Sequence, residues 1–331
     1  MTRLVQIEHP QNGRRVAVVE GDQLRLLASH RSVYGFAMSA IQTGLTLESL
    51  VAGDISEDSL DYDEIYSLRS EWRLLAAFDH PGEPACCLVS GTGLTHLSSG
   101  ATRAGTPEDG KVTDGMRLYQ WGVENGRPDG GVIGVAPEWF AKGNGAVLRA
   151  HGESLIIPNY ARGGGEEAEL AAVYLIDLEG VPRRIGFTPG NEFSDHRMRK
   201  LNSLYHAGAK RRACSIGPEV TIGAEFRSIR GAVSIERAGA AVWSKEIQTG
   251  EANMCHSLAN LEHHHFKYED HRRPGDAHVH FLGATAFSFA AGFEIQDDDE
   301  VVIEFEGFGR ALRNTVKLDR RSPAQVAVKG L

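Results

Sequence analysis

Apolar residues gather along this chain in short runs that are typical of β-strands. Two runs near the N-terminus, 4–7 and 16–19, are followed by Gly21-Asp22, which predicts a hairpin turn. Residues 32–50 have a more helical pattern, and Ser32 is a candidate N-cap. The first region is therefore expected to combine a few strands with a helix.

A turn signal, Asp79-His80-Pro81-Gly82, closes this region, so we place a domain boundary near residue 80. It separates a small N-terminal α/β domain, 1–80, from a larger domain, 81–331. The larger domain opens with a strand that leads into a loop carrying His96. Residues 98–128 are polar and Gly-rich, and their length suits a lid or an active-site flap.

Strand signals dominate from residue 133 onward, with helix candidates at 194–207 and 251–262. The predicted fold class is therefore mixed α/β and rich in β-structure. Three consecutive histidines, 263–265, are expected at a polar element end with one of them buried. His278 and His280 alternate on a probable strand, and the sequence does not decide whether they face the site or the solvent.

Composition narrows the classes of partner. The chain has 331 residues, of which 41% are hydrophobic and 24% charged, as in an ordinary globular protein. Its net charge of −9 without a long basic block argues against nucleic acid and anionic membranes as partners. No run has transmembrane length, and the first ten residues lack the apolar segment of a secretory signal. Four cysteines without Cys-x-x-Cys spacing favour reduced thiols in a cytoplasmic protein.

The sequence Glu167-Ala168-Glu169 directly precedes the apolar run 170–176, which is expected to be a buried strand. Side chains at alternate strand positions point to the same side, so the two carboxylates would lie together and repel each other unless a cation lies between them. Mg²⁺ prefers such ligands, and Glu192 in a later turn is the natural third. The same spacing also suits a solvent-exposed strand face, and both interpretations stay open.

Seven short motifs, in order, carry a resemblance to the fumarylacetoacetate hydrolase superfamily over about residues 85–317. They are 87–96, 137–143, 167–170, 191–194, 210–219, 283–285 and 306–315. The resemblance implies a catalytic domain built around a rolled mixed β-sheet and usually a homodimer. It also implies a bound Mg²⁺ or a similar cation such as Mn²⁺ or Ca²⁺, with Glu167, Glu169 and Glu192 as ligands.

Within the superfamily, residues 202–210 resemble members that act on 2-keto-3-deoxy sugar acids. Many small hydrolases of the family instead carry a glutamate three residues after the base histidine, where this chain has Ser99. Glu108 or Glu124 from the flap are candidate replacements. The third metal ligand is usually aspartate, so Glu192 is a departure that favours a shifted cation or Mn²⁺, because Mg²⁺ demands near-ideal geometry.

The resemblance implies a chemistry for a small 2-keto acid substrate. A cation chelated by the C1 carboxylate and the C2 carbonyl acidifies the C3 protons, and the C4 hydroxyl then leaves. Lys210 would transfer a proton or neutralise negative charge, and His96 is a candidate general acid or base. Thr285 and the backbone of Gly283 and Ala284 would hold the substrate carboxylate.

Three functions remain open at this point. The first is dehydration of a 2-keto-3-deoxypentonate to 2-oxoglutarate semialdehyde in sugar breakdown. The second is hydrolysis of a C–C bond in a 2,4-diketo acid, with water activated by His96 and a partner carboxylate. The third is a sugar-acid binding protein without catalysis, which would be favoured if Glu192 cannot complete the metal site.

Overall fold

The computed structural model describes residues 1–98 and 112–331, and Glu108 lies outside the described residues. The helices are α1 Val33–Thr43, α2 Leu47–Asp54, α3 Tyr62–Tyr66, α5 Asp114–Asn125, α6 His196–Leu201, α7 His206–Lys210 and α8 Leu258–Phe266. Short 3₁₀ helices are η1 Pro84–Cys86, η2 Gly145–Val147, η3 Ser203–Tyr205, η4 Glu251–Asn253, η5 Glu269–Arg272 and η6 Ser288–Ala291.

The strands belong to a large mixed sheet and a smaller second sheet. They are β1 Thr2–His9, β2 Gly13–Glu20, β3 Gln23–Leu27, β4 Ile55–Asp61, β5 Arg73–Leu74, β6 Cys87–Gly93, β7 Glu138–Asn144, β8 Leu148–Arg149, β9 Leu155–Ile157, β10 Ala168–Ile176, β11 Pro182–Asn191, β12 Cys214–Ile216, β13 Val220–Ile222, β14 Ile229–Arg237, β15 Ala240–Thr249, β16 Ala277–Phe281, β17 Glu300–Phe305 and β18 Leu312–Leu318. The predicted mixed α/β, β-rich class is confirmed.

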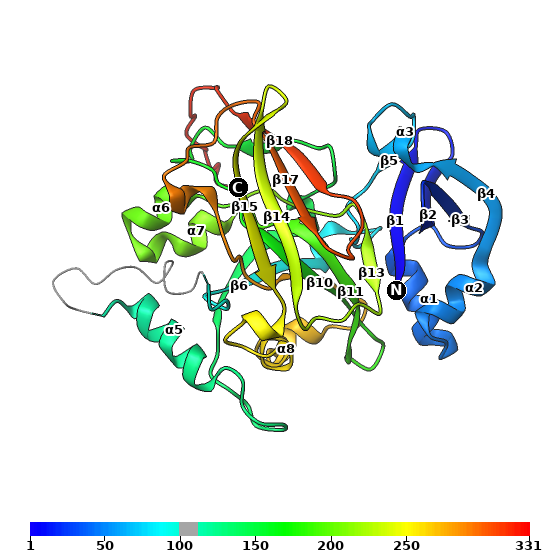
Figure 1. Cartoon of the computed structure of the whole chain (residues 1–331), viewed down its shortest axis with the longest axis horizontal. Helices are drawn as coiled ribbons and strands as arrows, with labels where there is room; N and C mark the ends of the chain where they lie inside the picture. The colour runs from blue at the N-terminus through cyan, green and yellow to red at the C-terminus, as the bar shows by residue number, and fades with distance from the viewer. Residues whose placement is uncertain (99–111) are drawn as a thin grey trace.

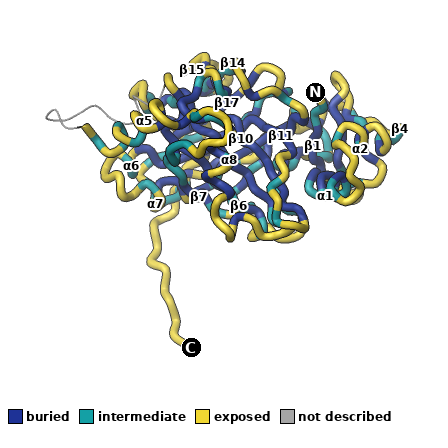
Figure 2. Tube along the Cα trace, turned by 90° about the horizontal axis from the view of Figure 1, so that it is seen from below, coloured by how far each residue is buried: buried dark blue, intermediate teal, exposed yellow. Residues whose placement is uncertain are grey.

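The large sheet runs in the order β4-β3-β2-β1-β13-β11-β10-β16-β6-β7, and the second in the order β15-β14-β17-β18-β9. Figure 1 shows β14, β15 and β17 crossing in front of β10 and β11. Buried residues of β10, such as Leu170 and Tyr174, share one apolar cluster with Val233 and Ile303 of the second sheet. The two sheets therefore enclose the main core (Figure 2).

Strand β10 is buried along its whole length, as the apolar run predicted. Leu170 and Tyr174 face the second sheet, whereas Ala171 and Val173 belong to the cluster on the other face, which helix α1 covers. A strand packed on both faces needs an unbroken apolar run rather than an alternating one. The buried strand that results places the acidic residues at its start inside the molecule.

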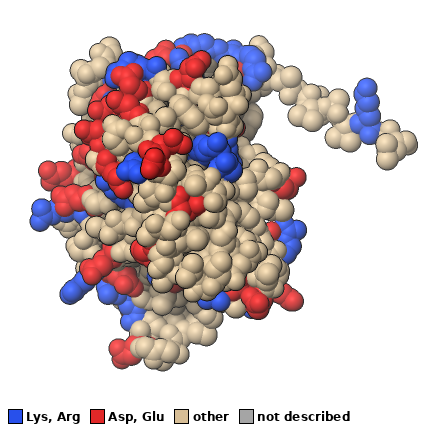
Figure 3. Space-filling view, turned by 90° about the vertical axis from the view of Figure 1, so that its right-hand side faces the viewer, with Lys and Arg blue, Asp and Glu red and all other residues tan. Residues whose placement is uncertain are grey.

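The N-terminal strands extend the large sheet. The β2–β3 turn at Gly21 forms the predicted hairpin, with Glu20 opposite Gln23. Strand β1 pairs with β13, which hydrogen-bonds this region to the main sheet. The boundary near residue 80 stays a prediction. Figure 3 shows acidic and basic side chains interspersed on this side of the molecule, separated by uncharged surface.

The helix expected over residues 32–50 is two helices. Ser32 caps α1 as predicted, because its Oγ accepts a hydrogen bond of 3.0 Å from the Gly35 N–H. The helix ends at Gly44, whose φ of 68° belongs to the left-handed region. Thr46 then caps α2. The helix is thus interrupted where the continuous pattern had indicated a single one.

Within the expected flap, α5 has only Gly122 buried, and Trp121 is 52% exposed. Figure 1 shows α5 projecting from the end of the molecule opposite the N-terminal strands. Glu124 of α5 is exposed. A lid role for this segment stays a prediction. In the parts of the chain that the structure describes, no helix has the length and apolar character needed to cross a membrane.

The three consecutive histidines close helix α8, and two of them are buried rather than one. His264 Nε2 donates to the Gly134 carbonyl at 2.9 Å, and His265 packs against strand β16. There its Nε2 lies 3.0 Å from His278 Nδ1, and its ring stacks on His280 at 4.2 Å. Both strand histidines therefore face α8 in the core, not the solvent.

This histidine cluster predicts acid sensitivity. Burial, together with the charges of neighbouring imidazoles, lowers the pKa of His278 and of His280 from 6.5 to about 3. Below pH 6.5 the unfolded chain binds protons that the folded protein does not, so stability is lost as pH falls from 6.5 toward 3. Over this range each of the two histidines lowers the free energy of unfolding by about 1.4 kcal/mol per pH unit.

Substituting His280→Asn should flatten this dependence, because asparagine keeps a polar atom near Ser90, which bonds His280 Nδ1 at 2.9 Å. Urea unfolding at about pH 7.5 and about pH 5 should show a stability loss smaller by about 2 kcal/mol than in the wild type. The exposed His263→Asn, on the same helix α8, is the control and should keep the wild-type difference. An unchanged difference in His280→Asn would contradict the interpretation.

Candidate metal centre

The β10–β11 hairpin brings three buried glutamates together. One carboxylate oxygen each of Glu167, Glu169 and Glu192 lies within 4.8 Å of the others, and each residue is at most 1% exposed. The Glu192 N–H donates to the Glu167 carbonyl at 2.9 Å, which continues the hairpin beyond its strands. This carboxylate triad consists of the residues predicted as metal ligands, and its ligand role stays a prediction.

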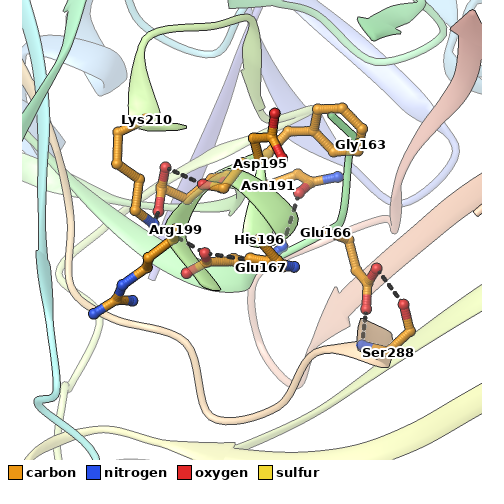
Figure 4. Close-up of polar contacts among 12 residues, drawn as sticks. Gly163, Glu166, Glu167, Asn191, Asp195, His196, Arg199, Lys210 and Ser288 are labelled. Carbon is orange, nitrogen blue, oxygen red and sulfur yellow. Dashed lines mark hydrogen bonds and ion pairs between the residues drawn. The ribbon is translucent and has the colours of Figure 1, made fainter. Parts of the chain in front are cut away.

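Two lysines balance part of the triad's charge. Lys210 of α7 donates from Nζ to Glu167 Oε1 at 2.9 Å and also to Glu192 Oε2. Lys142 of β7 donates to Glu192 Oε1 and, at 2.7 Å, to the Phe193 carbonyl. Both side chains are buried. Figure 4 shows Lys210 directed at the carboxylates from one side of the cluster.

The donor set fits a hard divalent cation. Glu169 Oε2 accepts a 2.6 Å hydrogen bond from the Gly283 N–H, whereas its buried Oε1 has no hydrogen-bond partner in the described residues. Burial raises the pKa of Glu169 well above its usual value, and the charges of Glu192 and Glu167 raise it further. A cation would supply the missing partner and relieve this repulsion. The triad could therefore bind a metal ion, and its all-oxygen ligands suit Mg²⁺, Mn²⁺ or Ca²⁺.

Further residues orient the triad. His196 Nε2 lies 2.9 Å from Glu167 Oε1, and Ser194 Oγ donates to Glu192 Oε1 at 3.0 Å. Glu166 points elsewhere, to the N–H and hydroxyl of Ser288 (Figure 4). Burial raises its pKa to about 7. The two adjacent glutamates thus have different partners. Glu166 accepts hydrogen bonds from Ser288 at the start of η6, whereas Glu167 belongs to the carboxylate triad.

The predicted substrate-binding loop borders the triad. Gly283 has a φ of 107°, which favours glycine, and a Cβ there would lie 2.0 Å from Thr95 Oγ1. The Gly283 N–H already donates to Glu169 Oε2, so Thr285 is the better candidate for binding the substrate carboxylate. Thr285 Oγ1 is buried and lacks a hydrogen-bond partner in the described part of the chain. Ala284, between them, is 3% exposed.

His96 lies beside the same loop. A Cβ on Gly283 would be 3.2 Å from His96 Nδ1. The imidazole is buried between two threonines, with Nε2 at 2.8 Å from Thr249 Oγ1 and Nδ1 at 3.1 Å from Thr95 Oγ1. Thr95 donates its own proton to the Leu282 carbonyl, so Nδ1 of His96 must be the donor in that contact. His96 Nε2 can act on a substrate only if the Thr249 hydroxyl moves away from it.

A surface cavity of about 1290 Å³ lies beside Thr285 and the residues that follow His96. Its lining includes Leu97 and Ser98, which follow His96, together with Asn253 and Thr285. The cavity thus connects solvent with the side of the site on which His96 and Thr285 lie.

Sequence reasoning assigned no role to several residues that the structure places here. Lys142 lies within the motif 137–143. The signal that could have indicated its position is its spacing of two residues from the apolar Phe140, which places both on the same side of a strand. The pair of Arg199 and Glu138, 2.7 Å apart, lies beside His206. Phe140 joins the pair to the triad, because its ring packs against His206 and lies 4.4 Å from Lys210 Nζ. No local pattern indicates such contacts between separate elements.

Comparisons with known proteins gave matches among solved structures. No family model matches the chain, and no curated protein sequence does. A 2-keto-3-deoxy-D-arabinonate dehydratase in its apo form aligns with a TM-score of 0.72 at 18% identity, over 96% of this chain and 100% of the other. Its complex with magnesium and 2,5-dioxopentanoate aligns with a TM-score of 0.71, at the same identity and coverage.

A 2-hydroxyhepta-2,4-diene-1,7-dioate isomerase from Mycobacterium marinum also matches, with a TM-score of 0.60 at 17% identity, over 97% of this chain and 100% of that one. These alignments span nearly the whole chain. They show that the chain shares the fold of this dehydratase and this isomerase, which agrees with the predicted fold class.

Proposed function

We propose that this protein is a divalent-cation-dependent hydro-lyase that acts on a 2-keto-3-deoxy sugar acid. A 2-keto-3-deoxypentonate is the proposed substrate, and 2-oxoglutarate semialdehyde is the product. The observation that carries the proposal is the buried triad with Lys210 against two of its carboxylates. The likeness to a dehydratase fold supports it, because that protein's structure holds magnesium and 2,5-dioxopentanoate.

When bound, a cation would be chelated by the C1 carboxylate and C2 carbonyl oxygens of the substrate and would acidify the C3 protons. Glu167, Glu169 and Glu192 would hold that cation. Thr285 would orient the substrate carboxylate through its buried hydroxyl. In this arrangement the carboxylate end of the acid would lie at the triad, and the hydroxyl-bearing carbons would lie farther from it.

Lys210 is the proposed proton carrier at C3. Its Nζ bridges Glu167 and Glu192, so a proton on it is stabilised by carboxylates while the substrate carbon gains negative charge. Removal of a C3 proton and departure of the C4 hydroxyl together release one water. A proton then moves from C5 to C3, which gives an enol at C4 and C5, and transfer of the enol hydroxyl proton to C4 leaves the aldehyde at C5. The Glu138–Arg199 pair, beside His206, would contact the distal hydroxyls.

The test is turnover of D- and L-2-keto-3-deoxypentonate with Mg²⁺, with products identified by mass spectrometry. We expect a product lighter than the substrate by one water molecule. Inertness toward both sugar acids combined with cleavage of a 2,4-diketo acid into two fragments would instead establish the C–C hydrolase. Tight binding of a sugar acid without any product would leave the non-catalytic binding protein as the function.

A further inference from the structure

The buried charges around the triad do not balance a divalent cation. With all three carboxylates ionised, as cation binding requires, the triad carries three negative charges. Lys142 and Lys210 contribute two positive charges, and both are buried against it. A divalent cation therefore leaves the cluster with one net positive charge. A net charge in a buried site is costly unless an opposite charge accompanies it.

The neighbouring charged groups do not remove this excess. Arg199 is paired with Glu138 at 2.7 Å, and the buried Arg212 is paired with Asp195 at 3.2 Å, so each pair is neutral. Glu166 is directed away from the cluster (Figure 4). His196, in contact with Glu167, can add only positive charge if it is protonated. The opposite charge has to come from a ligand.

We propose that the cation and a monoanionic 2-oxo acid bind to this site cooperatively, and that Lys142 sets the strength of the coupling. The inference rests on the proposed function, from which it takes the substrate class. The carboxylate of a 2-oxo acid brings the loaded site to neutrality, so each ligand strengthens the binding of the other. By linkage the two effects are equal in size.

Lys142 is suited to this role because its charge is fixed in place. Its ammonium group is fully buried and is held by Glu192 Oε1 and by the Phe193 carbonyl. Lys210 instead borders Phe140 at the side where we place the substrate. Without the Lys142 charge, the cation alone would neutralise the cluster, and the anion would then add an uncompensated negative charge.

The experiment measures Mn²⁺ affinity by calorimetry with and without saturating pyruvate, a monoanionic 2-oxo acid that lacks the C4 hydroxyl. In the wild type we expect pyruvate to tighten Mn²⁺ binding by about tenfold or more. Lys142→Met should bind Mn²⁺ alone more tightly than the wild type, and pyruvate should change its affinity by less than about threefold. Lys200→Met, an exposed lysine of α6, is the matched control and should behave as the wild type.

Pyruvamide provides a second test that needs no variant. It offers two chelating oxygens but carries no charge, so it should tighten Mn²⁺ binding to the wild type clearly less than pyruvate does. Equal tightening by pyruvamide and pyruvate would overturn the charge argument, as would Mn²⁺ binding that pyruvate leaves unchanged. Full coupling in a folded Lys142→Met would overturn the assignment to Lys142. Failure of the wild type to bind Mn²⁺ at all would overturn the proposed cation site and this inference with it.

Discussion

Replacing Glu169 with glutamine is expected to abolish cation binding and to lower turnover of the sugar acid by about a thousandfold or more. Glutamine keeps the shape of the side chain, and its oxygen can still accept the hydrogen bond from Gly283. It removes the negative charge and the buried Oε1, which lacks a partner in the described residues. Mn²⁺ titration and steady-state kinetics measure the two effects separately.

Glu166→Gln is the matched control for this substitution. Glu166 is a buried glutamate of the same stretch, but its carboxylate bonds Ser288 rather than the triad. The control should therefore bind Mn²⁺ with nearly wild-type affinity. Equal losses of Mn²⁺ affinity in both variants would show that the loss comes from the effect of a buried carboxylate on folding and not from removal of a ligand. Wild-type cation binding by Glu169→Gln would exclude Glu169 as a ligand.

Lys210→Met should separate chemistry from cation binding. We expect kcat to fall by about a hundredfold to ten-thousandfold, since a positioned proton carrier contributes a factor of that size. Mn²⁺ affinity should not fall, because the substitution removes a positive charge that contacts Glu167 and Glu192. Proton exchange at C3 of 2-oxobutyrate, followed by NMR in D₂O, should stop in the variant.

The exposed Lys200→Met again serves as the control and should retain both turnover and C3 exchange. If Lys210→Met loses turnover but still exchanges the C3 protons, Lys210 does not carry the C3 proton. Its contribution would then fall in a later step, such as departure of the C4 hydroxyl. Loss of cation binding in a folded Lys210→Met would contradict the charge argument altogether.

The sequence predicted which residues form the triad, although the Glu-x-Glu spacing left a solvent-exposed strand face open as an alternative. Alternation along a strand places Glu167 and Glu169 on one side, and the apolar run that follows showed that this strand is buried. The return strand of the hairpin then brings Glu192 opposite Glu167. These relations are local or depend on one hairpin, which is why the motif indicated them correctly. Lys210 came from the family resemblance alone, and its contacts with the triad agree with the role expected of it.

The contacts that complete the site depend on pairing between distant segments. Lys142 reaches Glu192 because β7 pairs with β6, and β6 lies parallel to β16 in the sheet. The Gly283 N–H meets Glu169 across 114 positions of sequence. No periodicity encodes such encounters. The split of the first helix at Gly44 had a visible signal, a glycine followed by the N-cap Thr46, which the longer apolar pattern obscured.

The most direct test of the central claim is the location of a bound cation. A crystal grown with Mn²⁺ and pyruvate would show the ion by its anomalous scattering. We predict one strong site that is coordinated by an oxygen from each of Glu167, Glu169 and Glu192 and by two oxygens of pyruvate. A site elsewhere in the molecule, or a triad still bridged by Lys210 without any ion, would contradict the account.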